Sequence, residues 1–267
     1  MSLPIGSLLR TAVGRHGLGL VPDPKGHGHA SIDKLGLASV SAGPYTVERF
    51  CGPVRDQFGT SSCVAQAILD AEVTTLRARY GISAEIGSRL QLYRGARVLS
   101  GGPIVDLGCH PSDALRWLDK NGIAPESQWP FSVVKVNAKP PVSARWDARE
   151  RRGVRGSYMA YDRGDQLVEV FKSTLASMRV PCIGIPVDEA MLANRGPERL
   201  KWENRGVPVG LHMVNIVALD YLDGEWCGRI RNSWGPLWRA SGYAYVSQGY
   251  LMHPVSACVV DPESAGQ

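Results

Sequence analysis

The segment Val54–Gln66 constrains this chain more than any other part of it. Gln57 stands six positions before Cys63, with glycine, threonine and serine residues between them, and a helical pattern begins directly after the cysteine. A cysteine at the start of a helix is a candidate nucleophile, because exposed backbone N–H groups and the helix dipole favour the thiolate. The side-chain amide of Gln57 offers a hydrogen bond to a developing oxyanion. The segment therefore predicts half of a catalytic site, and a base is still required.

The second half of the chain supplies a candidate base and a residue to orient it. A buried strand is expected to begin beside His212, and a second short strand is expected to end at Asn232. Asn232 opens an Asn-Ser-Trp-Gly run that contains Trp234, and it is followed by Trp238 and then by Gly-Tyr at 242–243. Such a run rarely arises by chance.

The order Gln, Cys, His, Asn resembles that of the papain-like cysteine peptidases, over roughly residues 44 to 260. His212 lies 149 positions after Cys63, within the range of about 130–150 typical of that family. The resemblance implies an α+β, papain-like, two-lobed fold. One lobe would be helical and the other an antiparallel, β-barrel-like lobe, with the active site in the cleft between them. It also implies a thiol (cysteine) endopeptidase that hydrolyses peptide bonds, of a bacterial or phage type with a short N-terminal extension.

The resemblance assigns a role to each residue of the motif. Cys63 would be the nucleophile, held as a thiolate–imidazolium pair with His212. Asn232 would orient the imidazole, and Trp234 would cover that contact from water. Gln57 and the backbone N–H of Cys63 would form the oxyanion hole.

The resemblance also indicates where a substrate would lie. Gly108 and Cys109 align with a Gly-Gly pair that lines the substrate groove of the family. Leu211, just before the histidine, and Trp234 are further candidates for substrate contact. Thr60 stands where the family has a bridging cysteine, so that family disulfide is absent here.

The hydrophobic patterns place helices in the first half and most strands in the second. Helices are expected near 62–80, 83–99 (capped by Ser83), 112–122 and 165–178. Strands are expected near 154–159, 181–187, 212–221, 226–232 and 242–247. We expect an N-terminal extension or pro-like arm over 1–43 and a catalytic domain over 44–267. Its helical lobe would span about 52–130 and its β-rich lobe about 131–260.

Bulk properties exclude several other classes of protein. The 267 residues suit one compact catalytic unit, and a net charge of +5 is too mild to argue for nucleic-acid binding. No apolar run approaches the roughly 18–20 residues that a membrane span needs. The N-terminus is broken by Pro4 and Gly6, so we expect no Sec-type signal and a cytoplasmic protein, or one delivered by a non-Sec route.

The six cysteines predict free, mostly buried thiols in a reducing compartment. If Cys63 is the nucleophile, five remain, and an odd number cannot all pair. No C-x-x-C pair occurs, so a structural zinc site is not expected. We expect no cofactor.

Residues 1–43 are glycine-rich and lack a helical pattern, so we expect an extended arm. Our hypothesis is that this arm wraps the body and partly covers the cleft, which would make the protein self-inhibited. The expected partner is a peptide or protein substrate. Two alternatives stay open: a narrow-specificity amidase or isopeptidase that uses the same four residues, and a catalytically silent papain-like binding module. The presence of all four residues argues against a silent module.

Overall fold

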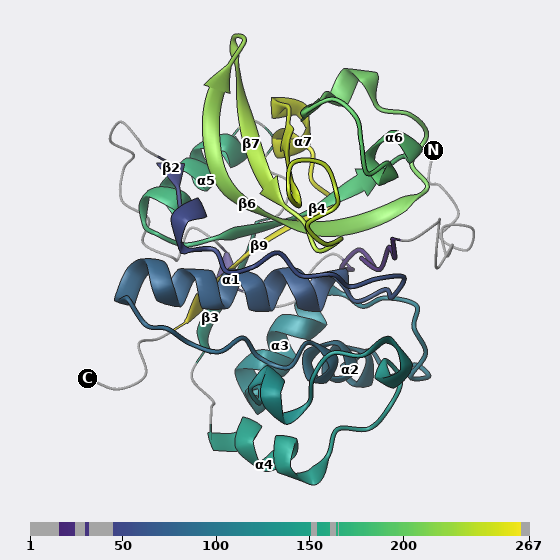
Figure 1. Ribbon diagram of the computed structural model, residues 1–267. Helices are drawn as coiled ribbons and strands as arrows, with labels where there is room; N and C mark the ends of the chain where they lie inside the picture. The colour runs from purple at the N-terminus through teal and green to yellow at the C-terminus, as the bar shows by residue number, and fades with distance from the viewer. Residues whose placement is uncertain are drawn as a thin grey trace.

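The computed structural model describes residues 16–24, 30–31, 45–150, 154–160, 164 and 166–262. Of the expected arm, the description therefore covers two short pieces, and the remainder of 1–43 lies outside it. Figure 1 shows one group of helices on one side of the molecule and most of the sheet, with the remaining helices, on the other, while one long helix, α1 (Cys63–Tyr80), lies between them. This arrangement confirms the α+β, two-lobed expectation.

The helical side contains the three helices expected from the first half of the sequence and a fourth, over Val142–Glu150, that was not expected. It contains α1, α2 (Arg89–Leu99), α3 (Pro111–Asn121) and α4 (Val142–Glu150). The helix α1 ends at Gly81, whose φ of 67° is the left-handed value that glycine adopts without strain. Ser83 was expected to cap the second helix, and this prediction is wrong. The cap is Ser88, whose Oγ accepts from the Gln91 N–H and donates to the Trp129 carbonyl.

The described strands form one sheet in the order β1-β3-β9-β4-β6-β7-β8-β5, with β2 paired to β6. Their bounds are β1 (Ala30–Ser31), β2 (Tyr45–Thr46), β3 (Val154–Ala160), β4 (Pro181–Val187), β5 (Arg199–Leu200), β6 (Gly210–Leu222), β7 (Glu225–Arg231), β8 (Tyr243–Val246) and β9 (Ser256–Pro262). The central ladders are antiparallel, as expected. The end pairs β1–β3 and β5–β8 are parallel. The helices α5 (Gln166–Ala176), α6 (Glu189–Leu192) and α7 (Gln248–Met252) complete this side.

The helix α1 is buried on more than one side. It contacts β4, β6 and β9 of the sheet and also α2 and α3. Twelve of its residues, including Cys63 at its first position, are therefore buried. On the helical side, α2 and α3 approach closely at Gly95, where a Cβ atom would lie 2.2 Å from the Trp117 ring. Burial on both sides holds the first turn of α1 rigidly against the start of β6.

All six cysteines are free thiols, and five of them are buried. The described residues include no group of three or more His, Cys, Asp or Glu side chains that could hold a metal ion. None of the described helices is both long and apolar enough to cross a bilayer.

Candidate active site

Cys63 is the first residue of α1, and its side chain has no solvent exposure (0%). Burial raises the pKa of this thiol to about 11, because the interior disfavours a charged sulfur. The backbone N–H groups of Met213 and Gly19 act in the opposite direction and lower the pKa, as donors near a sulfur do. Met213 is the neighbour of His212 on β6, so these contacts bring the sulfur to the start of that strand.

His212 and Asn232 are joined by a hydrogen bond of 2.7 Å between the histidine Nε2 and the amide Oδ1. The Ser233 N–H donates to the same oxygen, also at 2.7 Å, which identifies that atom as an acceptor. Nε2 of His212 therefore carries the proton. Nδ1 is buried without a partner among the described residues, so its lone pair is free. An imidazole held in this way can accept a proton at Nδ1.

Trp234 shields this pair from water. Its ring lies 4.3 Å from the His212 ring, with an interplanar angle of 31°, and Trp234 itself is only 2% exposed. Burial lowers the pKa of His212 to about 4, although the bond to Asn232 opposes that shift. In this closed structure burial thus favours the neutral forms of both Cys63 and His212. The sequence led us to expect the ion pair instead, and the difference follows from the exclusion of water.

Gln57 is fixed at both ends of its side-chain amide. Its Oε1 accepts from the Ser233 hydroxyl at 2.6 Å. Its Nε2 donates to the Thr60 carbonyl at 2.7 Å and to the Gly17 carbonyl at 3.0 Å. Gly17 belongs to the N-terminal arm, so the amide expected to meet a substrate's oxygen already meets an oxygen of the chain itself.

The described arm segment, residues 16–24, contacts residues that were predicted to line the substrate groove. Its Gly19 carbonyl accepts from the Cys109 N–H at 3.0 Å, and the Val21 N–H donates to the Cys109 carbonyl at 3.1 Å. These two bonds make a parallel bridge between Leu20 and Cys109. The Leu20 N–H also donates to the Leu211 carbonyl at 3.3 Å. The arm thus pairs with the groove through backbone groups, as an added strand does.

All four predicted substrate contacts lie along this segment. Cys109 and Leu211 hydrogen-bond it, and Trp234 stacks on His16 with the ring centroids 4.7 Å apart. At Gly108 a Cβ atom would lie 2.3 Å from the Gly19 carbonyl oxygen, so only glycine fits there.

Two glycines of the arm permit its close approach to the body. A Cβ atom on Gly17 would lie 1.9 Å from the Thr60 carbonyl oxygen, and one on Gly19 would lie 1.9 Å from the Ser61 carbonyl oxygen. The alternate residues Leu18 and Leu20 point away from this contact and are each only 6% exposed. Apolar burial therefore adds to the backbone pairing.

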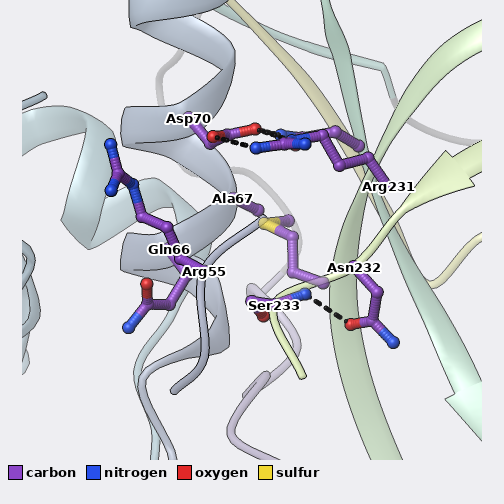
Figure 2. A pocket seen from close by; sticks show the side chains of 9 residues that line it. Arg55, Gln66, Ala67, Asp70, Arg231, Asn232 and Ser233 are labelled. Carbon is purple, nitrogen blue, oxygen red and sulfur yellow. Dashed lines mark hydrogen bonds and ion pairs between the residues drawn. The ribbon is translucent and has the colours of Figure 1, made fainter. Parts of the chain in front are cut away.

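An ion pair behind the site was not foreseen from the sequence. Arg231, the residue before Asn232, donates from Nε to Asp70 Oδ2 at 2.6 Å and from Nη2 to Asp70 Oδ1 at 3.1 Å. Figure 2 shows these contacts beside a small cavity of about 20 Å³ that is also lined by Gln66 and Ser233. Asp70 lies on α1, so the pair ties the helix that carries Cys63 to the strand that leads to Asn232. The sequence did carry a signal for this pair, because a carboxylate such as Asp70 within a largely apolar helix needs a cationic partner. Ser233, next to Asn232, was likewise missed.

The chain is similar in sequence to known peptidases. No family model matches it. An uncharacterized peptidase C1-like protein of Acanthamoeba polyphaga mimivirus is 24% identical over 207 residues, which are 73% of this chain and 64% of that protein. Peptidase 1 of Dermatophagoides farinae is 25% identical over 205 residues, which are 74% of this chain and 57% of that protein. The chain thus spans about three-fifths of the length of these curated relatives.

Two solved structures share the fold. Xylellain, a cysteine protease from Xylella fastidiosa, superposes with a TM-score of 0.71 at 24% identity, covering 94% of this chain and 99% of that one. Digestive procathepsin L 3 of Tenebrio molitor larval midgut gives a TM-score of 0.66 at 17% identity, covering 95% and 76%. These likenesses show a papain-like fold, and the order of Gln57, Cys63, His212 and Asn232 resembles that of the papain-like cysteine peptidases.

Proposed function

We propose that this protein is a thiol endopeptidase that hydrolyses peptide bonds with Cys63 as its nucleophile. The observation that carries the proposal is the 2.7 Å bond between His212 Nε2 and Asn232 Oδ1, which leaves Nδ1 free. The backbone N–H of Met213, the next residue on β6, contacts the Cys63 sulfur. An amide acceptor orients the imidazole without adding charge, so the ring can hold a proton when it faces a thiolate. The mite relative named Peptidase 1 and the mimivirus protein named peptidase C1-like support the same reaction.

In the proposed reaction, His212 Nδ1 takes the thiol proton, and the Cys63 sulfur attacks the peptide carbonyl carbon. The oxyanion that forms accepts hydrogen bonds from Gln57 Nε2 and the Cys63 N–H. As the C–N bond breaks, the imidazolium returns its proton to the leaving amine. A water molecule then attacks the thioester, again with His212 as base. This releases the acid and restores the thiol.

We further propose that the arm keeps the enzyme inactive until it moves. The Gly17 carbonyl accepts a hydrogen bond from the Gln57 side-chain amide. Cys63 and His212 have no solvent exposure while the arm is in place. Several of the structural neighbours are proenzymes, including procathepsin L 3, which supports a covered form.

A digest of a peptide library by Gly19→Ala, a variant designed to expel the arm, tests the function. Cleavage of many internal peptide bonds, lost on adding Cys63→Ala, is the expected result. Cleavage confined to one linkage or to side-chain amides would indicate the narrow amidase or isopeptidase instead. No turnover, in a variant whose cleft is shown to be open, would indicate the binding module.

A further inference from the structure

A second pocket, with a volume of about 220 Å³, lies apart from the cleft. Its walls come from residues between 188 and 205, including β5 and η6 (Trp202–Asn204), and from Tyr250 of α7. It shares no lining residue with the small cavity behind Asn232. The proposed peptidase reaction makes no use of it.

One polar side chain at this pocket has buried donors without partners: on Arg205, Nε and Nη1 are buried and lack a partner within the described residues. Tyr250, only 2% exposed, brings a hydroxyl to the same pocket. The Arg205 guanidinium is held in place over the Trp202 ring, 3.7 Å from its centroid. Because buried donors in native proteins almost always have partners, this group of donors points to a bound molecule.

The charges at the pocket select the kind of molecule. Arg205 and Lys201 are cations on its wall, whereas Arg199 is already paired with Asp223 at 2.7 Å. The lining carboxylate, Asp188, accepts from the Met191 N–H at 2.8 Å and from the Gly206 N–H at 2.7 Å. Each of its oxygens therefore already accepts a backbone hydrogen bond, whereas Arg205 Nε and Nη1 have no partner among the described residues.

Burial keeps the Tyr250 phenol in its donor form. It raises the pKa of the phenol to about 12, and the neighbouring Asp188 carboxylate adds to that shift. The hydroxyl is therefore protonated at any physiological pH and can donate to an anion.

We propose that this pocket binds a small organic oxyanion whose oxygens accept from Arg205, Tyr250 and Lys201. Phosphate and carboxylate groups share this chemistry, and a guanidinium matches the geometry of both. The volume of about 220 Å³ lies below the roughly 300 Å³ of pockets for drug-sized ligands. It still exceeds the share of a few water molecules, at about 30 Å³ each. The ligand is therefore a compact molecule that carries an oxyanion.

Calorimetric titration of the full chain with inorganic phosphate, phenyl phosphate and benzoate tests the proposal. We expect saturable binding of one molecule per chain, and comparison of the three probes shows whether phosphate or carboxylate is preferred and whether an organic group adds affinity. Tyr250→Phe removes only the hydroxyl, and Arg205→Gln removes the unpaired cation. Each should weaken binding of the preferred probe at least about tenfold, the loss expected for one charge-assisted hydrogen bond.

Arg195→Gln is the matched control, because Arg195 is an exposed arginine of the preceding loop that does not line the pocket. It lowers the net charge as Arg205→Gln does, and it should leave binding unchanged. Should Arg205→Gln unfold the chain, Tyr250→Phe still decides the matter. The proposal is overturned if none of the probes binds, if Tyr250→Phe binds like the wild type, or if Arg195→Gln weakens binding as much as Arg205→Gln. Binding is measured without peptide turnover, so failure here leaves the peptidase proposal untouched.

Discussion

The Gln57 side-chain amide donates to the Gly17 carbonyl oxygen across 3.0 Å, so the arm occupies the donor that a reacting carbonyl would need. The other end of the same amide is held by Ser233 at 2.6 Å. Under the proposed mechanism, the donor is oriented to meet an oxyanion and is occupied at the same time. If the proposal holds, the protein should gain activity when the arm is displaced, without further rearrangement.

Gly19→Ala should displace the arm. The added methyl group would lie 1.9 Å from the Ser61 carbonyl oxygen, a backbone atom that cannot easily move. We expect the rate of Cys63 alkylation to rise at least about tenfold. Pro24→Ala is the control, because Pro24 is an exposed residue of the same segment. Equal alkylation rates in Gly19→Ala and the wild type would show that the arm does not limit access.

Acid should weaken the closed form. The folded-state pKa of His212, about 4, lies below its ordinary value of 6.5, so the closed form binds fewer protons than an open one between these values. The free energy of unfolding of the closed form should be highest above about pH 6.5. It should fall as the pH drops toward 4, by up to roughly 3 kcal/mol for a fully buried group.

The measurement is the free energy of unfolding against pH, compared between wild type and His212→Asn. The comparison is needed because burial also raises the pKa of Glu72 to about 7, and that shift favours the folded state at low pH. If the difference between the two proteins stays constant from pH 7 to 4, burial of neutral His212 contributes nothing.

Asp70→Ala should destabilise the chain strongly. The Arg231 side chain is only 3% exposed, and the substitution leaves its charge buried without a carboxylate. Breaking such a pair costs about 3–5 kcal/mol. Urea unfolding checks the value, and the double variant Asp70→Ala/Arg231→Met should recover part of the loss. A loss below about 1 kcal/mol would mean that water enters the cavity of Figure 2 and solvates Arg231.

Ser233→Ala should lower turnover while leaving peptide affinity nearly unchanged. The Ser233 hydroxyl fixes Gln57 Oε1, and without it the amide can rotate away from the oxyanion. We expect kcat to fall by as much as about 10²–10³-fold, the loss typical when one oxyanion-hole donor is removed. The measurement is kcat and KM in the Gly19→Ala background, with Ser241→Ala as an exposed serine control. A rise in KM alone would assign Ser233 to substrate binding instead.

Much of the site could be predicted because its residues stand in contiguous motifs. The segment after Gln57 and the Asn-Ser-Trp-Gly run each place a functional group at the end of a helix or strand. Local patterns failed where tertiary contacts decide. Ser83 and Ser88 are both serines within the same stretch, and tertiary contacts fix Ser88 as the cap: its N–H donates to the Ala124 carbonyl and its hydroxyl to the Trp129 carbonyl. The path of the arm depends on backbone hydrogen bonds and on the absence of side chains at Gly17 and Gly19. Contacts of this kind leave no hydrophobic periodicity in the sequence, so a pattern search cannot find them.

The pH dependence of iodoacetamide alkylation, mapped to individual cysteines, tests most directly whether His212 activates Cys63. It is measured in Gly19→Ala with and without His212→Asn. If His212 activates Cys63, modification of Cys63 should be rapid and selective and should persist well below pH 7. In His212→Asn it should be slow until the pH approaches the ordinary thiol pKa of about 8.5. Identical profiles in the two proteins, or labelling spread evenly over the six thiols, would contradict it.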